Sequence, residues 1–199
     1  MNLNTAAKLI LELREKDERN RAELVQSGKL SYGYNEEMSA IHDSNAKELE
    51  RIMESIGFPT AEKLGEEASE AAWLIIQHSI GQPDFMKRCA ALMAIEVEKG
   101  HADKIHFTYL TDRIAVFEGR PQKFGTQFDW DKDGEMSPSE LDNYDKVNQR
   151  RAAMGLSSLE EQTRRIRERA KTENERPPQD HEQRKKAYDQ WRRSVGWIK

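Results

Sequence analysis

The stretch EEASEAAWLIIQHSI, residues 66–80, decides the fold. Its run AAWLII leaves almost no polar face, and a helix of that kind is normally buried on all sides. Gly81 and Pro83 follow directly, a combination that suits a helix terminus. We therefore expect a central helix over 66–80, against which the other elements pack.

Amphipathic helices are predicted on both sides of this segment. Apolar residues recur at helical spacing among charged ones in residues 5–26, 36–56 and 84–99. The stretch HFTYLTDRIAVF, residues 106–117, also suits a strand through its β-branched and aromatic residues, but its apolar spacing favours a helix. Alternation and turn residues predict strands near 122–137. The expected fold class is mainly α: a single orthogonal helical domain with a small β-hairpin near 122–137 and a C-terminal helical extension.

The end of the chain differs from the rest in charge. The net charge is −4, yet the last part is mildly basic and the remainder acidic. We expect a compact domain over residues 1–159 and a charged helical tail over 160–199 that breaks near Pro177. Trp191 and Trp197 make the tail apolar enough to dock either onto the domain or onto a partner protein, and the sequence leaves both open.

Composition excludes several classes of protein. The one cysteine, Cys89, lies in an apolar run and is expected to pack in the core rather than to react. No run approaches the roughly 20 apolar residues that span a bilayer, so a cytoplasmic protein without membrane contact is expected. The acidic body argues against nucleic acid as a ligand. The histidines have no zinc-site spacing, and phosphate-loop, dinucleotide and nucleophile-elbow motifs are absent.

The most specific local pattern is DWDKDGEMSPSE, residues 129–140, which follows the spacing of an EF-hand calcium loop. Gly134 stands where that loop turns sharply, and Ca²⁺ takes six to eight oxygen ligands. The candidate ligands are Asp129, Asp131, Asp133, Glu135 through its carbonyl, Ser137 and Glu140. The same residues suit a polar hairpin turn, and no helix-forming segment precedes them. No cofactor is certain, and Ca²⁺ is the one candidate.

Polar residues at the end of the central segment indicate a second candidate site. Gln77 and His78 must reach the edge of the core or find internal partners, because unpaired buried polar groups are costly. A histidine exchanges protons near neutral pH, and an arginine can clamp an anion. The candidate partners are Asp112, Arg113, Gln122, Thr126 and Gln127. The alternative is a satisfied core histidine, with the other side chains paired elsewhere.

Several spaced segments resemble an uncharacterised bacterial family of domains of unknown function. The segments are FPTAEKLGEEASEAAWLIIQHS (58–79), YLTDRIAVFEGRPQKFGTQF (109–128) and VNQRRAAMGLSSL (147–159). REKDERNR (14–21) resembles the family's Asp-Gln-x-x-Arg segment with Glu18 in place of glutamine, and HDSN supplies a similar Asp43 and Asn45. The resemblance spans about residues 9–160. It implies a list of site residues and no reaction.

Two functional hypotheses follow. In the first, the chain is a small-molecule or peptide binding domain, and whether it is also an enzyme stays open. A cofactor-independent hydrolase or transferase would use His78 for proton transfer, Arg113 to clamp an anion and Asp112 to orient either His78 or Arg113. Gln77, Gln122, Thr126 and Gln127 would complete the pocket. In the second, the chain is a non-catalytic interaction module with calcium at residues 129–140 and a protein partner on its tail.

Overall fold

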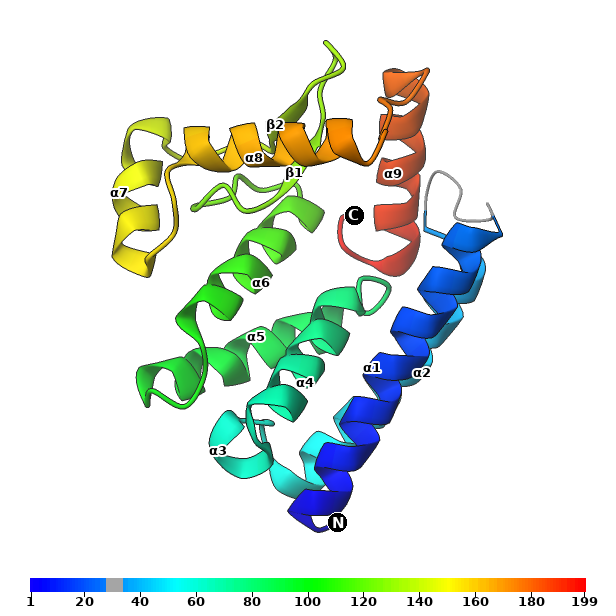
Figure 1. The fold of residues 1–199 in the computed structure, drawn as a ribbon, viewed down its shortest axis with the longest axis vertical. Helices are drawn as coiled ribbons and strands as arrows, with labels where there is room; N and C mark the ends of the chain where they lie inside the picture. Colours follow the sequence, from blue (N-terminus) through cyan, green and yellow to red (C-terminus); the bar gives the residue numbers. More distant parts are fainter. Residues whose placement is uncertain (28–33) are drawn as a thin grey trace. The chain divides into compact units, whose positions relative to one another are not determined.

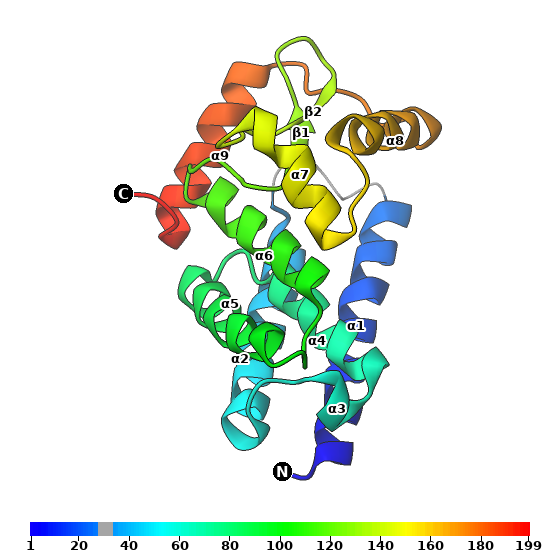
Figure 2. The same ribbon diagram turned by 90° about the vertical axis from the view of Figure 1, so that its left-hand side faces the viewer.

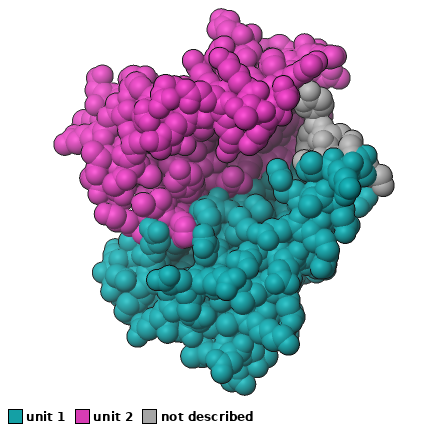
Figure 3. All heavy atoms as spheres, in the orientation of Figure 1, with its two compact units in different colours: residues 1–103 teal, residues 104–199 magenta. Residues whose placement is uncertain are grey.

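The structure is a computed structural model, and it describes residues 1–27 and 34–199. The chain forms two compact units, unit 1 over Met1–Asp103 and unit 2 over Lys104–Lys199 (Figure 3). Residues 160–199, expected from composition to form a tail, belong to unit 2. The domain boundary expected at 159/160 stays a prediction. In the described residues, no helix is both long enough and apolar enough to cross a membrane.

Unit 1 consists of helices. They are α1 (Leu3–Gln26), α2 (Glu36–Ile56), α3 (Ala61–Leu64), α4 (Glu66–His78) and α5 (Pro83–Glu98). The long helices α1 and α2 pack against each other (Figure 1). Asparagines cap their N-termini: the Asn2 side chain accepts from the Thr5 N–H, and the Asn35 side chain accepts from the Glu37 and Met38 N–H groups.

Helix α4 is the centre of unit 1, as the sequence predicts. It packs against α1, α2, α3 and α5. Ala71, Ala72, Ile75 and Ile76 are at most 1% exposed, so the apolar run forms the core of this unit. The short helix α3 lies in a stretch for which the sequence predicted no element.

Unit 2 begins with α6 (Lys104–Phe117), so the ambiguous stretch is a helix. A two-stranded antiparallel hairpin follows, β1 (Phe128–Trp130) and β2 (Met136–Pro138), with Trp130 opposite Met136. The helices α7 (Tyr144–Met154), α8 (Leu159–Thr172) and α9 (His181–Val195) complete the unit (Figure 2). The mainly α class with a small hairpin and a C-terminal helical extension is confirmed.

The tail docks inside unit 2. Phe117 at the end of α6 stacks on Trp197, with ring centroids 5.0 Å apart, and meets the edge of Trp191. The Arg192 guanidinium donates to the carbonyls of Val116 and Phe117 at the C-terminus of α6, where a helix leaves carbonyl groups without partners of its own. Of the two possibilities that the sequence left open, the structure shows docking within the chain.

Candidate functional site

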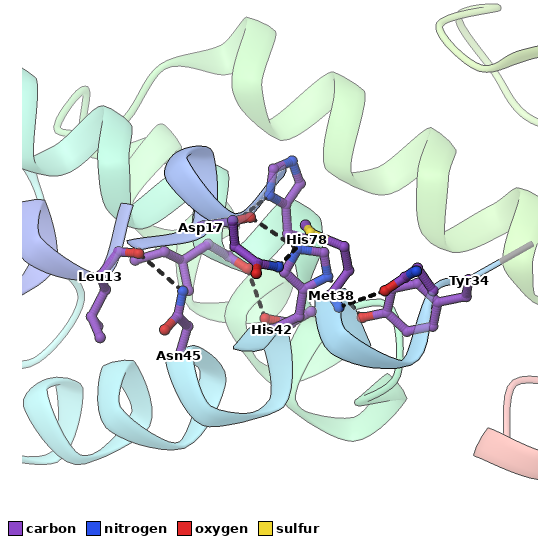
Figure 4. A network of polar contacts seen from close by, with 11 residues as sticks. Leu13, Asp17, Tyr34, Met38, His42, Asn45 and His78 are labelled. Carbon is purple, nitrogen blue, oxygen red and sulfur yellow. Dashed lines mark hydrogen bonds and ion pairs between the residues drawn. The ribbon is translucent and has the colours of Figure 1, made fainter. Parts of the chain in front are cut away.

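The candidate site surrounds one buried carboxylate in unit 1, that of Asp17 on α1, which is 1% exposed. Its Oδ1 lies 3.1 Å from Nε2 of His42 on α2, and its Oδ2 lies 2.6 Å from Nδ1 of His78 at the end of α4. Figure 4 shows both contacts and the helices that supply them. Three helices thus bring two imidazoles to one aspartate.

Helical periodicity places these side chains. On α1, the buried residues Ile10, Asp17 and Leu24 recur at a heptad interval, so Asp17 lies on the apolar face that packs into the core. On α2, His42 shares its buried face with Leu49. The last residue of α4 supplies the third side chain, at the point where the buried helix leaves the core.

The Asp17 carboxyl is ionised. Burial by itself raises the pKa of Asp17, but the hydrogen bonds from His42 and His78 lower it by more. The resulting pKa is well below the ordinary value for an aspartate. A carboxylate can only accept hydrogen bonds. The nitrogen that each imidazole turns toward Asp17 therefore carries a proton.

A tyrosine extends the cluster beyond His42. The Tyr34 hydroxyl lies 2.8 Å from Nδ1 of His42, and the two rings stack with centroids 5.6 Å apart. Burial raises the pKa of Tyr34, so its hydroxyl keeps its proton at neutral pH. Figure 4 shows Tyr34 on the side of His42 that faces away from Asp17.

Further polar contacts hold the helices in register around the cluster. Asn45 on α2 donates through Nδ2 to the Leu13 carbonyl of α1, at 3.1 Å. The Gln82 amide donates to Asp43, also at 3.1 Å. A Cβ at Gly81 would lie 3.1 Å from the Asp43 carboxylate, so a larger residue there would crowd this contact. Hydrogen bonds outside the cluster thus link the helices that carry Asp17 and His42, and also link the segment after His78 to α2.

The arrangement suits proton transfer through His78. Its side chain is 30% exposed, against 8% for His42, so His78 is the histidine that solvent or a ligand can reach. In residues 1–27 and 34–199, Asp17, His42 and His78 also form the group that could hold a metal ion, with ligand atoms within 4.8 Å of one another. Both nitrogen-to-oxygen distances are also within the reach of hydrogen bonds from the imidazoles to the carboxylate.

Asp112, predicted as a site residue, holds a loop in unit 2. It is 2% exposed, and its carboxylate accepts from the backbone N–H groups of Lys123, Phe124 and Thr126 and from the Thr126 hydroxyl, at 2.9–3.1 Å. Burial raises the pKa of Asp112, and these hydrogen bonds act in the opposite direction. Its oxygens are thus occupied by the chain itself.

Gln122 and Gln127 complete the same loop. The Gln122 amide group donates to the carbonyls of Gln127 and Ser139, and its oxygen accepts from the Gln127 N–H, each at 2.9 Å. The Gln127 side chain donates to the Thr126 hydroxyl at 3.1 Å. These contacts fix residues 122–127, and Thr126 links them to Asp112. Their expected place in a ligand pocket stays a prediction.

The buried Arg151 of α7 supports the same loop. It is 1% exposed and donates to the carbonyls of Phe124, Gly125 and Ser157. Gly125 has φ +65°, and a Cβ there would lie 2.6 Å from Leu159, so the loop requires glycine at this position. Arg151 is the second arginine of the segment VNQRRAAMGLSSL (147–159), and its contacts give it a structural role.

Arg113 is partly buried beside Tyr188 of α9, and burial lowers the pKa of its guanidinium. The predicted residues therefore fall into two groups. Gln77 and His78 belong to unit 1, and Asp112, Arg113, Gln122, Thr126 and Gln127 belong to unit 2. A common pocket for both groups stays a prediction.

The acidic loop at 129–140 is a tight hairpin turn. The Asp131 carboxylate accepts from the N–H groups of Asp133 and Glu135 and from the Ser137 hydroxyl. Asp129 forms an ion pair with Arg184 of α9, at 2.8 Å. A strand, β1, enters the loop where an EF-hand has a helix. Calcium binding by this loop stays a prediction.

Titration calorimetry with CaCl₂ tests that prediction. A calcium site gives saturable heat that disappears in the double variant Asp129→Ala with Glu140→Ala. Arg184→Gln is expected to increase the affinity, because the ion pair with Asp129 would no longer compete with the metal. No heat at about 1 mM Ca²⁺, near the weak end of known EF-hand affinities, rejects the site.

Comparison with protein families shows that residues 7–172 match a family of unknown function (DUF6624). The chain belongs to this family. Neither a curated protein nor a solved structure matches the chain. The Asp17 cluster and the loop held by Asp112 both lie within the DUF6624 region, and α9 lies beyond it.

Sequence reasoning missed Asp17 and His42 as partners of His78. Asp17 was present in the REKDERNR segment that resembles the family pattern, and His42 directly precedes Asp43 in HDSN. Both residues lie in segments that carry the resemblance, and a resemblance names no contact. Asp17 stands seven residues from both Ile10 and Leu24, which is the spacing of one helix face, and a charged residue on an apolar face requires a partner. That requirement is the signal that could have led to the histidines.

Proposed function

We propose that the chain is a small-molecule or peptide binding domain with an acid–base centre at His78, acting in hydrolysis or group transfer. The observation that carries the proposal is the contact of 2.6 Å between Nδ1 of His78 and buried Asp17, on an imidazole whose side chain is 30% exposed. Histidine is the side chain most often used for proton transfer near neutral pH.

The chemistry follows from the ring geometry. Because Nδ1 carries the proton that faces Asp17, the neutral imidazole has its lone pair on Nε2, at the opposite edge of the ring. Nε2 takes a proton from water or a hydroxyl as that group attacks, and later returns it to the leaving group. The negative charge of Asp17 stabilises the imidazolium that forms between these steps.

Asp17 thus takes the orienting role first considered for Asp112, whose carboxylate is occupied by residues 123–126. Arg113 as an anion clamp and the amides of Gln77 and Gln127 as ligand contacts are separate proposals. The centre at His78 does not depend on them.

The tautomer of His78 is the direct test of the acid–base centre. Long-range ¹H–¹⁵N spectra at pH 8 with EDTA are expected to show a protonated Nδ1 and an unprotonated Nε2 on this ring. In Asp17→Asn the preference is expected to weaken, because the amide replaces an acceptor-only group. A wild-type ring with its proton on Nε2 contradicts the proposal.

A ligand screen tests the function itself. Thermal shifts with a library of metabolites and short peptides are expected to give compounds that stabilise the wild type but not His78→Ala. His101→Ala is the matched control, since His101 is an exposed histidine of the same unit. For any compound that is turned over, the rate is expected to fall about 10²-fold or more in His78→Ala. Equal turnover in the two variants rejects catalysis by His78.

A further inference from the structure

We propose that His42 and Tyr34 form a positioning arm that fixes the Asp17 carboxylate for His78. This inference rests on the proposed function, since it concerns the group that orients the proton-transfer histidine. It adds two residues, His42 and Tyr34, that sequence reasoning did not assign to the site.

The arm is a continuous chain of contacts inside unit 1. Tyr34 Oη lies 2.8 Å from Nδ1 of His42, and Nε2 of the same ring lies 3.1 Å from Oδ1 of Asp17. The Ser39 side chain hydrogen-bonds to Tyr34 at the outer end. His42 is 7% exposed, so both edges of its ring meet protein groups in place of water. Figure 4 shows Tyr34, His42, Asp17 and His78 in succession.

The protons in this chain have one consistent arrangement for a neutral His42. Asp17 accepts only, so Nε2 of His42 donates to it, and the lone pair on Nδ1 accepts from the Tyr34 hydroxyl. The Ser39 hydroxyl then donates to the Tyr34 oxygen. Every member of the chain has a partner, and the direction of each hydrogen bond is set by the carboxylate at the inner end.

The consequence for His78 is geometric. His42 binds Oδ1 and His78 binds Oδ2, so the two hydrogen bonds fix the rotation of the carboxylate. The His42 and His78 rings also pack together, with centroids 5.0 Å apart. Without His42, Asp17 could turn about its side chain, and one oxygen would lose its buried donor. The hydrogen bond between His78 Nδ1 and Asp17 Oδ2 selects the Nδ1–H tautomer of His78, and its geometry would then be less well fixed.

The experiment compares His42→Leu, His42→Gln and Tyr34→Phe with the wild type. The readout is the rate at which His78 reacts with diethylpyrocarbonate at pH 8 with EDTA, mapped by mass spectrometry, together with the ¹⁵N tautomer spectrum. His42→Leu is expected to slow the reaction roughly tenfold, an effect equal to about 1.4 kcal/mol. His42→Gln restores the rate to within about twofold, because its amide can donate to Asp17. Tyr34→Phe gives an intermediate rate.

Controls separate this arm from the proposed function and from simple loss of fold. His101→Leu is expected to leave the His78 rate unchanged, and circular dichroism checks that each variant is folded. If His42→Leu leaves the rate and tautomer of His78 unaltered while Asp17→Asn changes both, the arm is rejected and the acid–base centre stands. A separate sample without EDTA receives one equivalent of ZnCl₂. If zinc shifts the ¹⁵N signals of both His42 and His78 and raises the thermal stability, these residues are metal ligands and the arm is rejected. A wrong tautomer in the wild type overturns the proposed function itself.

Discussion

Asp112→Ala is expected to lower the free energy of unfolding of unit 2 by about 3–5 kcal/mol, because it removes the common acceptor of several buried donors. The carboxylate accepts four donors from residues 123–126, three backbone N–H groups and one hydroxyl. Alanine would leave them without an acceptor, and each unsatisfied buried donor costs about 1–3 kcal/mol. The loop that carries Gln122 and Gln127 is expected to open as well.

Urea unfolding followed by hydrogen exchange and mass spectrometry measures this effect, because peptides from residues 104–199 report unit 2 separately from residues 1–103. Asp112→Asn is the graded control. It keeps one oxygen acceptor, so its loss should be roughly half that of the alanine variant. A stability within about 1 kcal/mol of the wild type for Asp112→Ala would show that the loop does not depend on this carboxylate.

The role of Asp112 illustrates how far the sequence could go. The order of helices followed from apolar periodicity, which depends only on spacing along the chain. The turn-forming residues around Gly134 likewise predicted where the hairpin lies. Asp112, Gln122 and Thr126 were grouped as candidate partners of His78, because buried polar residues in a mainly apolar region require partners. Whether such residues face a ligand or backbone amides depends on loop geometry, which the pattern does not contain.

The contacts of Asp17 show what the sequence could not predict. The sequence identified His78 through its place at the end of a buried helix, but its partner lies on a helix distant along the chain. Helical periodicity predicts which face of α1 is buried. It does not predict which residues of α2 and α4 lie opposite that face. Distances of 3.1 and 2.6 Å to two histidines come only from packing of the three helices.

Asp17→Ala is expected to destabilise unit 1 by about 3 kcal/mol at pH 7, since it removes the acceptor of two charge-assisted hydrogen bonds in the core. Asp17 is 1% exposed, so water cannot replace it without opening the helices. Chemical denaturation followed by hydrogen exchange of peptides from residues 1–103 measures the loss. Glu54→Ala is the matched control, an exposed acidic residue on α2, and its effect should stay within about 0.5 kcal/mol.

The dependence on pH distinguishes a charged network from a packing defect. The pKa of Asp17 is lowered in the folded protein, while an unfolded aspartate has a pKa of about 3.9. The unfolded state therefore binds the proton more readily, and the contribution of Asp17 is fully present above the unfolded pKa and declines as the pH falls through the folded one. The gap between wild type and Asp17→Ala should thus be largest between pH 5 and 7, and should narrow steadily below about pH 4. A gap of equal size at pH 7 and pH 2.5 would mean that the side chain acts through volume alone, and that its charge does not hold the two imidazoles.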